Sequence, residues 1–217
     1  MSENKGILCP HLILCEGADA TYFMIKYIDY LEDINEIGLK EFQAMNFGGN
    51  EELSNYLQLL TISRNKEIIK SITIIRDAEK DHIAAVQSIR TTLKNNGFSA
   101  PIHPNEIARD DKKKVAFSLF PTLSGQTENG TLEDLYLKNL VESADDLLSD
   151  IDIFINGLQS KGRYIPRKHK SRLYTYFAVT DKFTALKLAE AAEAGAFSFD
   201  CSEMNCLKSL LKEICSA

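Results

Sequence analysis

The chain has 217 residues, of which 44% are hydrophobic and 26% are charged, the balance of an ordinary globular protein. Its formal net charge of -6 excludes a general attraction for nucleic acid or anionic membranes, so any such binding requires a local basic patch or metal ions. No apolar run approaches the ~20 residues that cross a bilayer, and the polar residues 1–6 do not resemble a signal peptide. Five cysteines without a Cys-x-x-Cys pair complete the expectation of a cytoplasmic protein with reduced thiols and no membrane partner. The oligomeric state stays open.

Predicted strands and helices alternate in the first part of the chain. β-branched and other apolar residues predict strands over 7–15, 42–47, 69–76 and 115–120, and helical spacing predicts helices over 18–34, 51–62 and 82–95. Continuous apolar strands are typical of parallel sheets that are buried on both faces. We therefore expect an α/β fold, a Rossmann-like parallel sheet of about four strands sandwiched by helices.

The pattern changes near residue 130, after which only helices are predicted. They cover residues 132–139, 144–158, 173–177, 182–194 and 204–214. We interpret residues 1–130 as the α/β core and residues 131–217 as a helical C-terminal extension packed on that core.

Acidic residues follow two of the predicted strands. The first strand leads into Glu16, and the third is followed by Asp77, Glu79 and Asp81. Because ligands bind beyond the carboxyl ends of parallel strands, these acids converge if the two strands are neighbours. Crowded carboxylates either hold protons or bind a divalent cation, and oxygen ligands favour magnesium, calcium or manganese over zinc. The four histidines show no metal-ligand spacing.

Helix capping is the alternative explanation for these acids. Asp19, Asp77 and Asp81 stand at or near the starts of predicted helices, where a carboxylate is favourable. Capping explains Glu16 and Glu79 less well, because one helix start needs only one acid.

The acidic segments resemble those of a known domain. Cys15-Glu16-Gly17-Ala18-Asp19 and Asp77-Ala78-Glu79-x-Asp81 are similar to the motifs of the Toprim domain of topoisomerases, primases and OLD-family nucleases. The whole chain resembles a Toprim-related microbial family catalogued as a domain of unknown function. Further likeness lies in Phe120-Pro121 and in residues 130–135, 168–170 and 189–199.

This resemblance implies a Toprim-like fold and a role for each acid. Glu16 matches the Toprim glutamate, a general acid/base or metal ligand. Asp77 and Glu79 match the metal-binding pair, although the family motif has aspartate where this chain has Glu79. Asp81 matches a further acid, and Glu133 is a candidate for the additional carboxylate of two-metal nucleases.

Two ions about 3.5–4 Å apart at these acids would activate water and stabilise the leaving oxygen of a phosphodiester. We therefore expect Mg²⁺ or Mn²⁺ as cofactor and a nuclease, a phosphodiester hydrolase of Toprim type, as the function. The alternative is a non-catalytic Toprim-like module that binds metal, nucleotide or protein in a defence or stress system. The glutamate at position 79 and the acidic net charge favour this alternative, so enzymatic activity remains open.

Two further segments each have a functional and a purely structural interpretation. The polar residues 122–130 are either a substrate-facing lid or an ordinary surface loop. Residues 161–172 are predicted as a basic loop, in which Lys168, Lys170 and Arg172 are candidates for nucleic-acid contacts. The alternative is a solvated loop that offsets the acidic surface.

Overall fold

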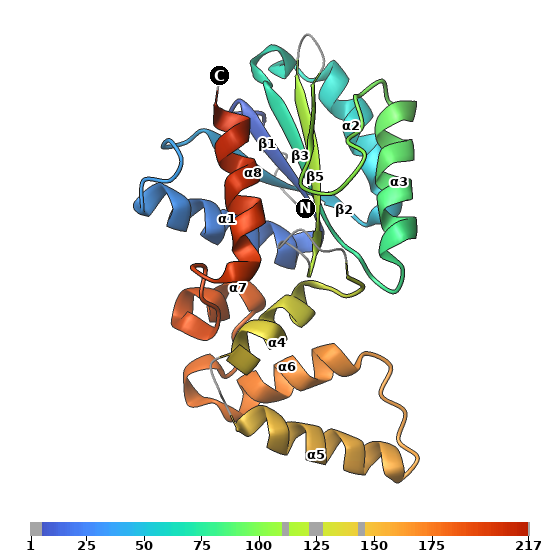
Figure 1. Ribbon diagram of the computed structural model, residues 1–217, viewed down its shortest axis with the longest axis vertical. Coiled ribbons are helices and arrows are strands. Elements are labelled where there is room, and N and C mark those ends of the chain that lie inside the picture. The colour runs from blue at the N-terminus through green and yellow to red at the C-terminus, as the bar shows by residue number, and fades with distance from the viewer. Residues whose placement is uncertain (1–5, 110–112, 122–127, 143–145, 217) are drawn as a thin grey trace.

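A central sheet of five strands, in the order β2-β1-β3-β5-β4, organises the molecule (Figure 1). The computed structural model describes residues 6–109, 113–121, 128–142 and 146–216. Four strands run parallel and the edge strand β4 pairs antiparallel with β5. Their bounds are β1 (His11–Glu16), β2 (Phe42–Gly48), β3 (Ser71–Asp77), β4 (Ile107–Arg109) and β5 (Lys114–Phe120). The predicted α/β class with a mostly parallel sheet is confirmed.

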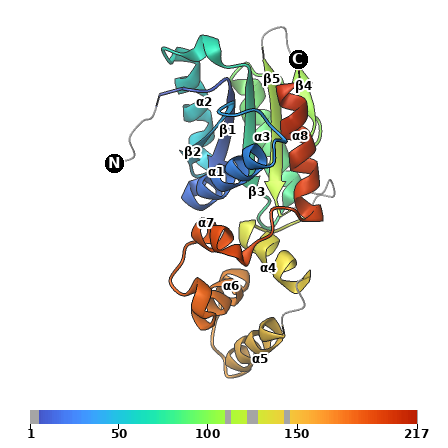
Figure 2. The ribbon, with the colours of Figure 1, turned by 90° about the vertical axis from the view of Figure 1, so that its left-hand side faces the viewer.

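Helices cover both faces of this sheet (Figures 1 and 2). One face packs against α1 (Gly17–Asp33) and α8 (Asn205–Cys215), and the other against α2 (Leu53–Ile62) and α3 (His82–Asn95). The alternation of side chains along β1 explains this arrangement, since Ile13 lies in the first apolar cluster while Leu12 and Leu14 lie in the second. The strand is therefore apolar throughout because both of its faces are buried.

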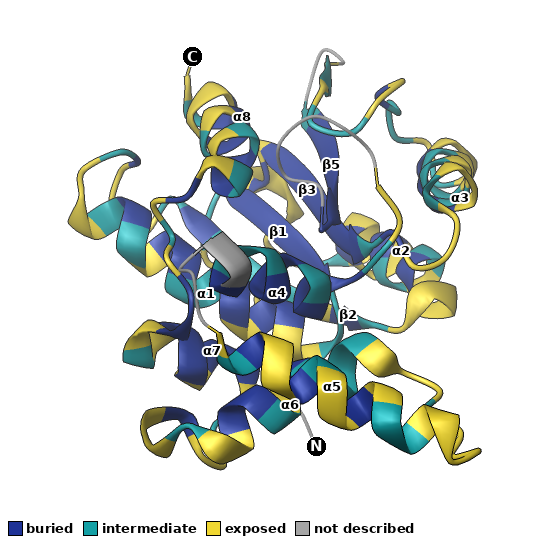
Figure 3. Cartoon of the chain, turned by 60° about the horizontal axis from the view of Figure 1, so that its bottom comes forward, coloured by how far each residue is buried: buried dark blue, intermediate teal, exposed yellow. Residues whose placement is uncertain are grey.

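Four helices lie beyond the carboxyl edge of the sheet, at the bottom of Figure 1. Their bounds are α4 (Leu132–Glu142), α5 (Leu147–Ser160), α6 (Lys168–Val179) and α7 (Leu188–Ala191). Figure 3 shows α4 between the strands and the pair α5 and α6, with much of its surface buried. Tyr136 of α4, Phe23 of α1 and Phe197 are in ring contact, so these helices share one apolar cluster with the sheet face. The boundary at residue 130 stays a prediction.

Several details differ from the predicted elements. The edge strand β4 was missed because three residues are too short for a periodic signal. The predicted basic loop ends at Arg167, since Lys168 begins α6. The predicted helix 182–194 is broken, with α7 followed by a π-turn in which Gly195 has φ 93°. Single turns of 3-10 or π-helix lie at Asn50–Glu52, Lys66–Ile68, Asp181–Phe183, Ala192–Ala196 and Ser202–Met204.

The predicted lid and the expected absence of a membrane-spanning helix can be compared only with the described residues. Residues 122–127, most of the predicted lid, lie outside them. Among the helices that the structure describes, none combines the length and the apolar character needed to cross a membrane.

Candidate functional site

Glu16 and Arg76 form an ion pair at the carboxyl edge of the sheet. β1 and β3 are paired neighbours with Cys15 opposite Ile75, so their next residues meet where the strands end. Arg76 Nε donates to Glu16 Oε2 at 3.1 Å. The side chain of Arg76 is only 4% exposed, and its Nη1 lies 3.4 Å from Ser88 Oγ of α3. Glu16 is thus held in place by a buried cation.

Asp77 ends β3 and points at the start of α4. Its Oδ1 accepts a hydrogen bond of 3.0 Å from the backbone N–H of Leu132, the first residue of that helix. Burial raises the pKa of Asp77 to about 7, and the nearby charges of Glu133, Glu16 and Glu79 also raise it. The hydrogen bond from the N–H of Leu132 acts in the opposite direction and lowers it. Asp77 therefore lies close enough to Glu133, Glu16 and Glu79 to be repelled by their charges.

Glu133 is a buried carboxylate, 3% exposed, in the first turn of α4. Its Oε1 lies 2.8 Å from Lys170 Nζ, and its Oε2 accepts a hydrogen bond of 2.8 Å from Thr131 Oγ1. Burial alone would raise the pKa of Glu133, but these two hydrogen bonds, a backbone N–H and the charge of Lys170 together lower it. Likewise, burial would lower the pKa of Lys170, but Glu133 and then Asp77 raise it. Lys170 thus serves both acids as a cation.

The other two predicted acids face solvent. Glu79 is exposed and has a left-handed backbone with φ 54°, and its N–H and carbonyl pair with those of Gly130 through two hydrogen bonds of 2.7 Å. Asp81 is the N-cap of α3, where its Oδ1 accepts from the N–H of Ala84 at 3.0 Å. Capping, the alternative explanation, therefore describes Asp81.

The five acids predicted as metal ligands are not arranged as a coordination shell. Within the described part of the chain, no three of the five predicted ligands place carboxylate oxygens within 4.8 Å of one another. Binding of a divalent cation by Glu16, Asp77 and Glu133 therefore requires their side chains to turn inward and Lys170 to withdraw from Glu133. Coordination at this edge stays a prediction.

The three predicted nucleic-acid contacts each have a partner in the protein. Lys170 pairs with Glu133, Lys168 Nζ donates to Asn156 Oδ1 at 2.8 Å, and Arg172 contacts both oxygens of Asp152 at 2.6 and 2.7 Å. Lys168 and Arg172 line a hollow of about 390 Å³ between α4, α5 and α6, together with Asp134, Leu137, Asp152, Asn156 and His169. Nucleic-acid binding by these residues stays a prediction.

Sequence analysis missed Arg76 and Thr131 and gave Lys170 a different role. Arg76 had a visible signal, because it is a charged residue inside the apolar run that becomes β3. Thr131 directly precedes the predicted helix 132–139 and was not predicted to contact a site residue. The pairing of Lys170 with Glu133 depends on the packing of α6 against α4, which no local pattern contains.

The family of the chain follows from one comparison. Residues 10–216 match the model of a family described as "Protein of unknown function (DUF3226)", and the chain belongs to that family. No curated protein and no solved structure matches the chain.

Proposed function

We propose that this member of the family is a divalent-metal-dependent phosphodiester hydrolase of Toprim type that acts on nucleic acid. One geometric observation carries the proposal. Glu16, Asp77 and Glu133 come from β1, β3 and α4 to the carboxyl edge of a parallel sheet, where such sheets bind ligands. Glu133 is buried there, and a buried carboxylate has a high cost unless a cation or hydrogen bonds compensate it.

The donor set fits magnesium or manganese. All three candidate ligands are carboxylates, which these ions prefer. When bound, such an ion supplies Lewis-acid stabilisation of phosphoryl oxygens and lowers the pKa of a bound water. The repulsion between Asp77 and its acidic neighbours supports the assignment, because a divalent charge would relieve it.

The remaining residues have roles that follow from their contacts. Arg76 orients Glu16, to which the Toprim resemblance assigns the role of a general acid/base or a metal ligand. Lys170 neutralises Glu133, and with a divalent cation in its place Lys170 would be free to contact a phosphate. Lys168 and Arg172 lie on the same helix and extend the basic surface along α6.

A non-catalytic module is the second candidate function. Two observations favour it: Arg76 and Lys170 already neutralise two of the three acids, and no three candidate oxygens lie within 4.8 Å among the residues described. In this case the two basic side chains take the place of the metal, and the site binds a nucleotide or a protein.

A cleavage assay separates the two functions. Labelled single- and double-stranded DNA and RNA are incubated with the full chain and Mg²⁺ or Mn²⁺, and with the variants Glu16→Gln and Asp77→Asn. The matched control is Glu67→Gln, an exposed acid away from the site. Metal-dependent cleavage that both site variants lose and the control keeps supports the enzyme. Absence of cleavage with every substrate rejects the enzyme and leaves the binding module.

A further inference from the structure

A second group of potential ligands lies at the opposite edge of the sheet, where the strands begin. His11 is the first residue of β1, Glu41 directly precedes β2, and Cys215 is the last residue of α8. One ligand atom from each of these residues lies within 4.8 Å of the other two, and no other trio of His, Cys, Asp or Glu in the described residues does so. We propose that His11, Glu41 and Cys215 form a zinc-binding site.

His11 is oriented as metal-binding histidines are. Its side chain is buried, and its Nδ1 lies 2.8 Å from Ser71 Oγ at the start of β3. An oxygen partner on one ring nitrogen fixes the ring and leaves the other nitrogen for a metal. That other atom, Nε2, lies 4.0 Å from Glu41 Oε2. Because Ser71 holds the ring from behind, Nε2 points into the space shared with the carboxylate.

The spacing of the three residues suits a tetrahedral ion. Zinc bonds of about 2.0–2.3 Å place neighbouring ligand atoms roughly 3.3–3.7 Å apart, so the trio, whose atoms lie within 4.8 Å of one another, must contract by at most about 1.5 Å. The backbone already fixes two of the residues, because the N–H of His11 donates to the carbonyl of Glu41 at 3.1 Å. Side-chain rotation of Glu41 and Cys215 therefore completes the approach.

Lys114 fixes the end of α8, the segment that carries Cys215. Its Nζ donates to the carbonyls of Ile214 at 3.0 Å and Glu213 at 3.3 Å, and also to that of Ser216. A cation is favourable at a helix C-terminus, and this one ties the end of α8 to the start of β5. Cys215, the last residue of α8, is thereby held beside the edge of the sheet where the strands begin. The site joins three segments that are distant in sequence.

The donor chemistry selects zinc over the ions proposed for the carboxylate site. A thiolate and an imidazole favour zinc, whereas magnesium and manganese prefer oxygen ligands alone. Thiolate and carboxylate together balance the charge of Zn²⁺. Glu41 is partly exposed, so a water molecule has access to the fourth position.

Cobalt substitution of the full chain tests the proposal. Co²⁺ bound to this site gives a thiolate charge-transfer band and the strong visible bands of tetrahedral cobalt. Zinc binds with one ion per chain, as measured by competition with a chromophoric chelator. Cys215→Ser removes the charge-transfer band and weakens zinc binding at least ~10-fold. The matched control is Cys206→Ser, which changes another cysteine of α8 and leaves both readouts intact.

Two outcomes overturn the proposal: a wild-type cobalt spectrum without a thiolate band, or a band that Cys215→Ser retains. Circular dichroism and thermal unfolding of the metal-free variants show whether each is folded, and Glu41→Gln provides a second test if Cys215→Ser is not. Asp77→Asn keeps the zinc stoichiometry and the cobalt spectrum, because Asp77 lies at the other edge of the sheet. The result is thus independent of phosphodiester hydrolysis.

Discussion

Lys170 Nζ lies 2.8 Å from Glu133 Oε1, so a side chain predicted to bind nucleic acid pairs with one predicted to bind metal. Glu133 is almost fully buried while Lys170 is about one-third exposed. The lysine can therefore leave for solvent, whereas the carboxylate cannot. In the proposed enzyme, an ammonium group and a divalent cation compete for the same carboxylate.

Lys170→Gln tests this competition. In the proposed enzyme, we expect tighter Mn²⁺ binding, by about 10-fold, because the metal no longer displaces an ammonium ion and the uncompensated buried Glu133 gains more from a cation. Isothermal titration with Mn²⁺ measures the affinity. Lys168→Gln is the control, because Lys168 hydrogen-bonds the neutral Asn156. Equal or weaker binding by Lys170→Gln contradicts the competition.

Removal of the Glu16 carboxylate leaves Arg76 buried without its partner. Loss of one partner of a buried ion pair costs about 3–5 kcal/mol, and because Glu16 is partly exposed we expect Glu16→Ala to lower the free energy of unfolding by about 1–3 kcal/mol. Glu16→Gln keeps a hydrogen-bond acceptor for Arg76 Nε and should cost less. Urea unfolding compares the variants. Equal losses in both would show that the hydrogen-bond acceptor kept by Gln contributes nothing once the charge of Glu16 is removed.

The titration of Asp77 gives the folded chain a pH dependence. Burial, followed by the charge of Glu133, raises its pKa from 3.8 to about 7. Between these values the folded state holds a proton that the unfolded state has lost, so the free energy of unfolding falls as pH rises. This contribution is fully present below the unfolded value and is lost as pH rises through about 7.

Asp77→Asn should remove that contribution. With a chelator present, the stability difference between the variant and the wild type should change by on the order of a few kcal/mol between about pH 5 and 8, in favour of the variant at high pH. Urea unfolding at a series of pH values measures it. A difference that stays constant over this range would contradict the raised pKa.

The sequence predicted the scaffold where strong local signals exist. Residues 82–95 were predicted as a helix and form α3 over the same residues, because Asp81 caps its start and Asn96-Gly97 ends it. The first strand was predicted from residue 7 but begins at His11. Leu8 is 70% exposed, and Pro10 has no N–H to donate to a neighbouring strand. Apolar composition alone therefore overestimated the length of β1.

Only those residues of the candidate site that lie at the ends of strands could be predicted from the sequence. Adjacent parallel strands bring Glu16 near Asp77, and that follows from the alternation of elements. The role of Lys170 was not predictable in the same way. Lys170 reaches Glu133 through the packing of α6 on α4, and His11, Glu41 and Cys215 meet only after α8 returns to the sheet. Such contacts depend on tertiary structure and leave no periodic trace.

Gly130 holds the segment beside Glu79 in a conformation that other residues rarely adopt. Its φ is 141°, and a Cβ atom there would lie 2.9 Å from Asp134 Oδ2 and 3.0 Å from Pro121 Cγ. We expect Gly130→Ala to lower the free energy of unfolding by about 1–3 kcal/mol. Gly157→Ala is the control, because a Cβ atom in α5 meets nothing within 4 Å and alanine favours the helix. Equal stability of the two variants in urea unfolding would contradict the strain.

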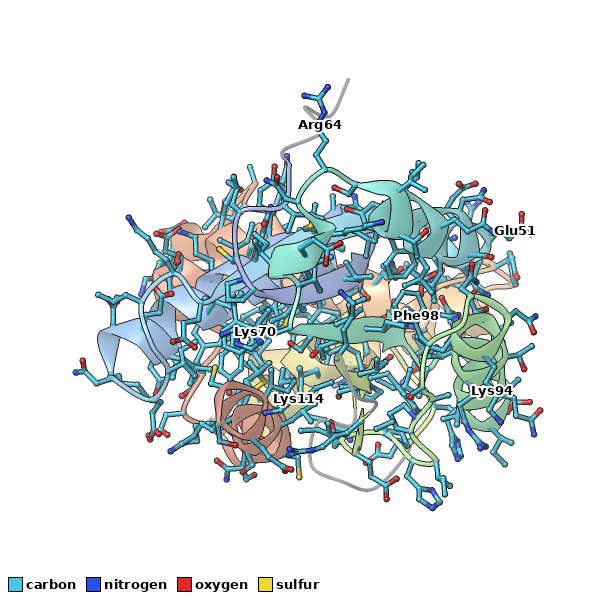
Figure 4. The ribbon with its side chains drawn as sticks, turned by 90° about the horizontal axis from the view of Figure 1, so that it is seen from above. Glu51, Arg64, Lys70, Lys94, Phe98 and Lys114 are labelled. Atoms are coloured by element: carbon cyan, nitrogen blue, oxygen red, sulfur yellow. The ribbon has the colours of Figure 1, made fainter. Side chains whose placement is uncertain are left out.

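Two lysines oppose a cation at the zinc-binding site. Lys70 and Lys114 stand over this edge of the sheet, near the end of α8 (Figure 4). Both charges act on His11 and lower its pKa, although burial is the larger cause. Lys114 also holds the carbonyls of α8, whereas Lys70 is exposed and can be changed with little effect on packing.

Lys70→Gln should therefore strengthen zinc binding. Removal of a unit charge near the ion gives a gain on the order of 1 kcal/mol, about a fivefold lower Kd, in water-exposed surroundings. The gain should shrink at high salt because exposed charges are screened. Chelator competition at two salt concentrations measures both effects. Lys94→Gln, in which an exposed lysine on α3 is replaced, is the charge-matched control. If the two variants bind zinc equally, the effect comes from net charge and not from the position of Lys70.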